Sequence, residues 1–281
     1  IDQDDQRAGW DTLIKNFPTY ERAKGWNVIR LCCEEQNYID KCNPYPHHLS
    51  KVVNITKKIN FLSDEGLAKV LNAVTENPRC VLFIPLPCTS GCYFNVAINE
   101  KIPSAQKKNS MNKREFEALW ARFETLCCLL EYNVPLVFEW PRHNVLWRIP
   151  KVKKLLEKMG CAMTNFDGCT FGLKSIRKGF EYRFLKKPWA FATNIPDVCY
   201  AFKSCCSGVC KHHQHNETRG NNALHSQKYT PLMAHTLHIA FYYYFNGSHT
   251  LLCNLMDHGL LTDNVKDGEF QRKDHEDKSS S

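Results

Sequence analysis

Short apolar runs alternate with segments of helical periodicity, and this alternation constrains the fold more than any other feature of the sequence. The runs 80–84 and 134–138 are apolar throughout, as strands buried on both faces of a sheet are. The segments 63–77 and 112–130 carry apolar residues at helical spacing behind residues that cap helices. The alternation predicts an α/β fold with a Rossmann-like, mostly parallel sheet and helices on both faces.

The chain divides by composition into three parts. We expect residues 1–195 to form the Rossmann-like domain. Residues 196–262 are expected to form a Cys/His-rich extension that ends in a helix starting at Pro231. Residues 263–281 are charged and end in serines, which predicts a disordered tail.

The chain contains 15 cysteines among 281 residues, which is an unusually high share. An odd count with adjacent pairs, such as Cys127 and Cys128, suits a disulfide framework poorly because neighbouring cysteines rarely bridge each other. A chain of this length can bury a core without disulfides. We therefore expect mostly reduced thiols and an intracellular, reducing compartment, the nucleus included.

Lysine and arginine number 37 and acidic residues number 29, which gives a formal net charge of +8 and a pI near 8.7. This balance permits a polyanionic partner such as nucleic acid. The most apolar stretch, 232–256, contains three histidines and two asparagines, so we expect no membrane span and no membrane partner. His235 and His238 are predicted to lie on the solvent face of the last helix.

Polar residues follow three of the expected strands at their carboxyl ends, where open parallel sheets bind ligands. Glu34 and Glu35 follow the first apolar run, Pro87 and Cys88 follow a later one, and Glu139 follows the next. A carboxylate at the end of an early strand commonly holds a ribose hydroxyl of a nucleoside cofactor. A solvated acid explains Glu34 and Glu35 equally well.

Cys88 lies in the segment Pro85-Leu86-Pro87-Cys88, and prolines stiffen a loop and remove backbone donors. The segment therefore predicts a thiol fixed at the edge of the sheet, the alternative being a structural cysteine in a turn. Glu139 ends the next strand and is expected beside Cys88. A thiol with an adjacent carboxylate is the arrangement of an acid-assisted nucleophile.

A strand ending in Pro-Cys, followed one helix later by a strand ending in Glu, resembles two motifs of the 5-methylcytosine methyltransferases. The stretch from Ile84 to Gly172 is also similar to the methyltransferase-like domain carried by some DIRS-type retroelements and related phage-like reading frames. The resemblance implies methyl transfer from S-adenosylmethionine to cytosine C5 in nucleic acid, with DNA as the favoured substrate. Its motifs are Pro87-Cys88-Thr89, Glu139-Trp140-Pro141, Asp167-Gly168-Cys169 and Lys187-Pro188-Trp189.

The resemblance implies a role for each of the residues at the strand ends. Cys88 would add to C6 of the base, and Glu139 would hold N3 and the exocyclic amine. A base in a duplex would first be flipped out of the stack. Glu34, Glu35 and Pro87 would contact S-adenosylmethionine.

The sequence also departs from the family pattern. It has no glycine-rich turn after the first apolar run, and Pro141 stands where the family has valine. If 28–31 forms the second strand of the domain, the glycine-rich loop lies upstream of Ile1. We therefore expect weak binding of S-adenosylmethionine, and the alternative function is a non-catalytic remnant that binds nucleic acid or a partner.

Lys186, Lys187 and Trp189 are candidate nucleic-acid contacts. The two lysines would bind phosphate and the indole would stack on a base. Surface lysines beside a half-buried tryptophan explain these residues equally well.

The residue types that zinc prefers gather late in the chain, at a spacing that matches no standard zinc finger. A polar, His-rich surface loop is the alternative. A zinc-dependent binding module centred on residues 199–225 is thus a third interpretation of the chain. The candidate ligands are Cys205, Cys206, Cys210, His212 and His215.

Overall fold

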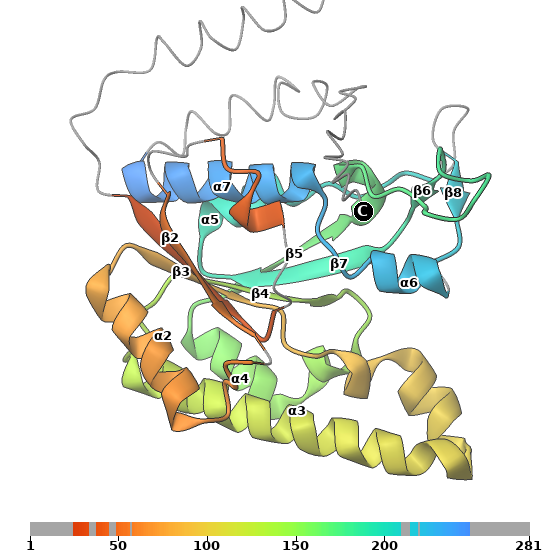
Figure 1. Ribbon diagram of the computed structural model, residues 1–281, viewed down its shortest axis with the longest axis horizontal. Coiled ribbons are helices and arrows are strands. Elements are labelled where there is room, and N and C mark those ends of the chain that lie inside the picture. Colours follow the sequence, from red (N-terminus) through yellow and green to blue (C-terminus); the bar gives the residue numbers. More distant parts are fainter. Residues whose placement is uncertain are drawn as a thin grey trace, which may run out of the picture.

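The computed structural model describes residues 25–33, 38–44, 49–56, 58–208, 214–218 and 220–247. Their centre is a six-stranded sheet with the order β2-β1-β3-β4-β7-β5 (Figure 1). The first four of these strands run parallel, and β7 runs antiparallel to both of its neighbours, so the expected α/β fold with a mostly parallel sheet is confirmed. The strands are β1 (Trp26–Leu31), β2 (Leu49–Ile55), β3 (Cys80–Ile84), β4 (Leu136–Pro141), β5 (Ala162–Asp167) and β7 (Pro188–Thr193).

The central strands β1 and β3 are buried at every residue. A parallel strand covered by helices on both faces has no solvent side, which is why its sequence is apolar without alternation. Arg30 on β1 is the charged exception, with only 1% of its surface exposed. Its guanidinium pairs with Asp40 at 3.2 Å and donates to Asn54 at 3.0 Å, as a buried charge requires.

Three helices cover one face of the sheet: α2 (Asp64–Glu76), α3 (Pro103–Leu129) and α4 (Pro150–Lys158) (Figure 1). Aromatic rings fill the space between α3 and β4. The ring centroids of Trp120 and Phe138 lie 5.8 Å apart, and those of Phe138 and Trp140 lie 4.6 Å apart. Edge-to-face contacts of this kind hold α3 firmly against the strand that carries Glu139.

The helix α3 begins at Pro103, earlier than the expected start near residue 112. Proline suits the first helical turn because its missing N–H would have no partner there. Ala105, Gln106 and Lys107 follow it and are good helix formers. The helix therefore includes residues that, by their polarity alone, were expected to lie before it.

The other face is covered by η1 (Tyr38–Asp40), α5 (Pro196–Ala201) and α7 (Pro231–Asn246) (Figure 1). Met233 and Leu237 of α7 pack in the same buried cluster as Phe83 of β3. The described residues after 195 thus share a core with the sheet. Beside them lie α6 (Asn221–His225) and a small parallel pair, β6 (Phe184–Leu185) and β8 (His215–Asn216).

His238 corrects the expectation that both histidines of α7 face solvent. Its side chain is fully buried, with Nε2 2.6 Å from the carbonyl oxygen of Ile39 and the ring 6.4 Å from that of Trp26. Burial lowers the pKa of His238 to about 4. The prediction was wrong because α7 is apolar around most of its circumference. The side of α7 that carries His238 was expected to face solvent, but η1 covers it.

In the part of the chain that the structure describes, no helix combines the length and the apolar character that a membrane span needs.

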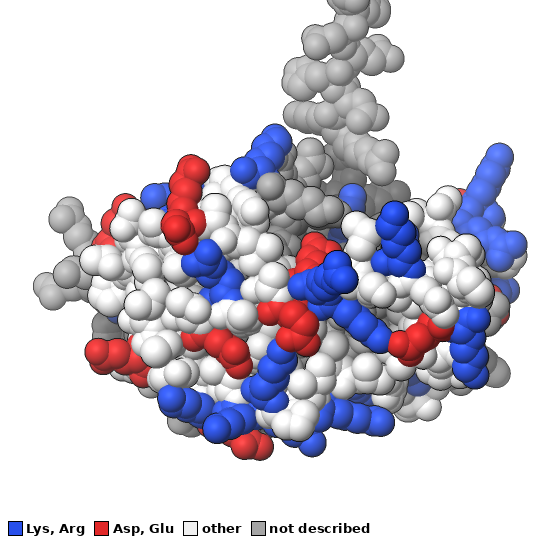
Figure 2. Space-filling model, turned by 90° about the horizontal axis from the view of Figure 1, so that it is seen from below, with Lys and Arg blue, Asp and Glu red and all other residues white. Residues whose placement is uncertain are grey.

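The face seen from below carries basic and acidic side chains interspersed (Figure 2). On α2 and α3 such charges pair directly, as Arg122 does with Asp64 at 3.2 Å. The described residues of this face form no uniform basic patch of the kind that the net charge would permit.

Candidate functional site

The carboxyl ends of β1, β3 and β4 meet at one edge of the sheet because the three strands are adjacent and parallel. The register pairs Ile84 with Phe138, which puts the loop after β3 next to Glu139. The chain leaves β1 toward β2 and leaves β3 toward β4, in opposite directions along the sheet. Open α/β sheets bind ligands at such a switch point, and Cys88 lies in the loop that starts there.

Two buried side chains hold the Cys88 loop to the segment after β4. The indole Nε1 of Trp140 donates to the carbonyl oxygen of Leu86 at 2.9 Å. The amide Nδ2 of Asn144 donates to the carbonyl oxygen of Cys88 at 2.8 Å. Both bonds are made to backbone atoms, so they fix the position of Cys88 and leave its half-buried thiol to interact with the site.

Gly91 lies where this loop meets Asn144. A Cβ at Gly91 would lie 2.1 Å from Oδ1 of Asn144 and 2.4 Å from Cγ of Leu146. We expect Gly91→Ala to displace Asn144 and to lower the free energy of unfolding by about 1–3 kcal/mol, as overpacking does. Urea unfolding measures the loss. A loss no larger than that of Thr89→Ala, an exposed position in the same turn, would contradict the prediction.

Glu139 is the acidic residue of β4, and its carboxylate faces Tyr229 and Lys187. The hydroxyl of Tyr229 donates to Oε2 of Glu139 at 2.7 Å. Burial raises the pKa of Glu139, whereas the nearby Lys187 and the bond from Tyr229 oppose the rise. A carboxyl group whose pKa is raised is suited to hold a proton and to release it to a bound ligand.

Lys187 precedes β7 and reaches into the same site. Its ammonium donates to the carbonyl oxygen of Ser226 at 2.6 Å and lies 4.6 Å from the ring centroid of Trp189. Burial lowers the pKa of Lys187, while the charges of Glu139 and Cys88 oppose that effect. The site therefore contains a carboxyl group (Glu139), a thiol (Cys88) and an amine (Lys187) that are close enough for their charges to shift one another's pKa.

The thiol of Cys88 is protonated at neutral pH. Burial raises its pKa to about 11, and the carboxylate of Glu139 adds to the rise, while Lys187 opposes it. Only a thiolate is a strong nucleophile, so Cys88 needs a proton acceptor at the moment it reacts. The carboxylate of Glu139 can serve as that acceptor.

Sequence reasoning missed Tyr229 and assigned Lys187 to a different role. Tyr229 is buried and packs edge-on against Phe83, with 5.3 Å between ring centroids. It lies 90 residues after Glu139, so no local pattern joins the two. Tyr229 directly precedes Thr230, which caps α7. This position beside a helix start is the one sequence signal that could have placed Tyr229 in the folded core.

The other residues predicted to contact the cofactor or nucleic acid lie in different environments. Glu34 and Glu35 lie outside the described residues. Pro87 is half-buried in the Cys88 loop. Lys186 is exposed and donates to the carbonyl oxygen of Cys206 at 3.3 Å. Trp189 is 1% exposed and lies in the buried cluster that also contains Met233 and Leu237 of α7, so the structure does not present its ring to a base.

The predicted zinc ligands are brought together only in part. Cys206 and His215 meet, with Sγ and Nε2 3.5 Å apart, and Cys169 joins them. Cys205 is exposed, and its sulfur accepts from the guanidinium of Arg142 at 3.3 Å, away from that group. Cys210 and His212 lie outside the described residues. Each described cysteine is a free thiol.

The chain matches no protein-family model, no curated protein and no solved structure. Functional inference therefore starts from the arrangement of its own side chains at the ends of β3 and β4.

Proposed function

We propose that the edge of the sheet at β3 and β4 is the base-binding site of a nucleic-acid cytosine-C5 methyltransferase-like domain. Cys88 is the nucleophile that adds to C6, and Glu139 holds N3 and the exocyclic amine. The observation that carries the proposal is the half-buried thiol in electrostatic contact with a carboxyl group of raised pKa, both at adjacent strand ends. Addition to a pyrimidine needs a nucleophile at C6 and an acid at N3, and a base held between the two groups could meet both.

The addition step balances with the residues present. The sulfur of Cys88 bonds to C6, the C5–C6 π electrons become a C4–C5 double bond, and the C4–N3 π electrons take up a proton at N3. The thiol loses its proton to the Glu139 carboxylate, which delivers one to N3. The net result is addition of S–H across C6 and N3. C5 is left electron-rich, which is the activation that methyl transfer to this carbon requires.

Tyr229 and Lys187 support the same step by positioning Glu139. The bond from Tyr229 takes one of the two acceptor sites of Oε2, so the other site and Oε1 remain for N3 and the exocyclic amine. Lys187 favours the ionised form of Glu139, in which it can accept the thiol proton. The amine thus tunes the carboxylate and is not required to contact the base.

The strand order is compatible with the proposal. Four parallel strands are followed by an antiparallel strand, β7, inserted between β4 and β5. The segment that resembles the Pro-Cys motif follows β3, the segment that resembles the Glu motif lies in β4, and these two strands are adjacent and parallel.

The described residues do not fit S-adenosylmethionine at the end of β1. A cofactor cradle there needs backbone amides that a ligand can approach closely, which glycine provides. Instead Cys32 occupies the left-handed region with φ of 53°, and its side chain packs against the core, where burial raises its pKa to about 12. This observation favours a second candidate, a domain that still binds a nucleic-acid base but does not transfer methyl groups.

An oligonucleotide containing 5-azacytosine tests the base-binding site without the cofactor. Nitrogen in place of C5 makes C6 more electrophilic, so addition can be followed on its own. We expect mass spectrometry to detect a covalent adduct at Cys88 that is absent from Cys88→Ser. Glu139→Gln should slow adduct formation about 100-fold or more, within the range of general acid–base catalysis.

Cys92→Ser is the matched control, because Cys92 is a half-exposed thiol in the same loop. It should form the adduct at the rate of the unaltered protein. An adduct that persists in Cys88→Ser, or no adduct in either protein while the oligonucleotide is bound, would contradict the nucleophile assignment. The second outcome would leave the non-catalytic binding domain.

A further inference from the structure

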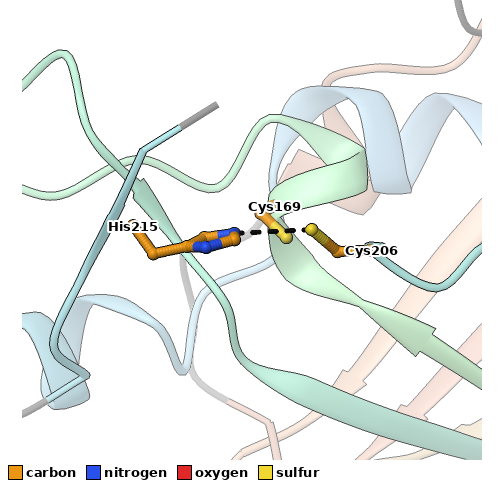
Figure 3. A group of neighbouring side chains, drawn as sticks. All are labelled: Cys169, Cys206 and His215. Atoms are coloured by element: carbon orange, nitrogen blue, oxygen red, sulfur yellow. Dashed lines mark hydrogen bonds between the residues drawn. The ribbon is translucent and has the colours of Figure 1, made fainter. Parts of the chain in front are cut away.

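We infer that Cys169, Cys206 and His215 form a zinc site that joins the end of β5 to the C-terminal extension. The three ligands come from separate segments, and their side chains point toward one another (Figure 3). Cys169 lies in η6 (Gly168–Phe171), Cys206 follows α5, and His215 lies on β8. The inference stands independently of the proposed function, since this cluster shares no residue with Cys88 and Glu139.

The distance between the ligand atoms of Cys206 and His215 is that of two ligands of a tetrahedral zinc ion, and Cys169 lies close to both. Zinc lies about 2.3 Å from sulfur and about 2.0–2.1 Å from nitrogen, so a tetrahedral angle places a sulfur and a nitrogen about 3.5 Å apart and two sulfurs about 3.8 Å apart. Sγ of Cys206 and Nε2 of His215 are 3.5 Å apart. All three ligand atoms lie within 4.8 Å of one another.

Backbone and side-chain groups around Cys206 hold it in position. The amide of Gly208 donates to Sγ of Cys206 at 3.4 Å. The amide of Cys206 itself donates to Oδ2 of Asp167 at 2.8 Å, and Asp167 is held in turn by Arg142 at 3.1 Å. Outer contacts of this kind orient the ligands of a metal and tune them.

The sulfur of Cys169 is buried, since 3% of the residue is exposed. A divalent cation would stabilise a thiolate there directly through its charge.

Two cysteines and one histidine select zinc over the hard cations, which take oxygen ligands. They supply three of four tetrahedral positions and leave the fourth to another donor. Cys205 is not among the ligands, since its sulfur contacts Arg142 at 3.3 Å and the carbonyl oxygen of Asn165 at 3.4 Å. Zinc at this position would cross-link η6, the segment after α5, and β8.

The test is a Co²⁺ titration of the full chain after reduction and removal of metal. We expect one equivalent of Co²⁺ to bind with thiolate-to-cobalt charge-transfer absorption and to be displaced by one equivalent of Zn²⁺. Cys169→Ser, Cys206→Ser and His215→Ala should each weaken Zn²⁺ binding by more than about 100-fold, the upper range for loss of an outer-shell partner. Cys205→Ser is the matched control and should bind as the unaltered chain does.

Co²⁺ binding without charge-transfer absorption, or equal loss in Cys205→Ser and Cys206→Ser with none in Cys169→Ser, would overturn the inference. Because replacing a buried cysteine can disturb folding, a second measurement uses the unaltered protein. Bound Zn²⁺ should slow alkylation of Cys206 at least about tenfold relative to Cys205, and a chelator should restore the rate. Equal alkylation of both thiols with and without Zn²⁺ would also overturn it.

Discussion

Alkylation of Cys88 by iodoacetamide is expected to accelerate about tenfold for each pH unit between pH 7 and pH 10, or about a thousandfold in all. Burial and the Glu139 carboxylate raise the pKa of this thiol to about 11. Only the thiolate reacts, and below the pKa its fraction rises about tenfold per pH unit. Mass spectrometry of the Cys88 peptide gives the rate, with the exposed thiol of Cys128 as a reference for the reagent.

Variants of the neighbouring charges should move this profile in opposite directions. Glu139→Gln removes a negative charge beside the thiol, so it should lower the pKa of Cys88 and speed alkylation at pH 8. Lys187→Met removes a positive charge and should slow it. In Glu139→Gln, Cys88 should then react faster with iodoacetamide but more slowly with 5-azacytosine. A general increase in the flexibility of the loop would not change the two rates in opposite directions. A rate that levels off below pH 9 would contradict the raised pKa.

Acidification from pH 7 to pH 4 is expected to lower the free energy of unfolding by up to about 3 kcal/mol through His238 alone. Burial lowers the pKa of this residue to about 4, from 6.5 in the unfolded chain. A depressed histidine pKa contributes stability that is present above the unfolded value and is lost as the pH falls toward the folded value. The difference of about 2.5 pH units corresponds to about 3 kcal/mol.

Urea unfolding at pH 7, 6 and 5 measures this loss. His238→Gln is the informative variant, because its amide can still donate to the carbonyl oxygen of Ile39 and it does not titrate. Its unfolding free energy should fall less steeply over the same range. Equal pH dependence in the two proteins would show that His238 is not the group responsible.

The fold class could be predicted from local patterns. The apolar runs of β1 and β3 are buried at every residue, as their lack of alternation indicated. The prolines before Cys88 and the position of Glu139 at the end of the next run placed both at one edge of a parallel sheet, because neighbouring parallel strands end together. Each of these inferences uses residues close in sequence and one general rule of sheet topology.

The partners of these residues came from parts of the chain that no local pattern connects. Tyr229 meets Glu139 because α7 packs across the sheet, and Lys187 enters the site because β7 reverses direction beside β4. Cys169 meets Cys206 and His215 because three segments that are distant in sequence pack together. The sequence alone had pointed to Cys205 as a ligand. Trp189, which looked available for stacking, is covered once α7 is in place.

The sequence by itself indicated the alternation of strands and helices from β1 to α4, the buried character of the central sheet and the edge at which its polar residues gather. These depend on hydrophobic periodicity and on backbone preferences of consecutive residues. The tertiary structure alone decided which side chains share that edge, which thiols meet a histidine and which rings are covered. Such pairings depend on how distant segments pack, and packing is selected by the volume and shape of the whole core, which periodicity along the chain does not encode.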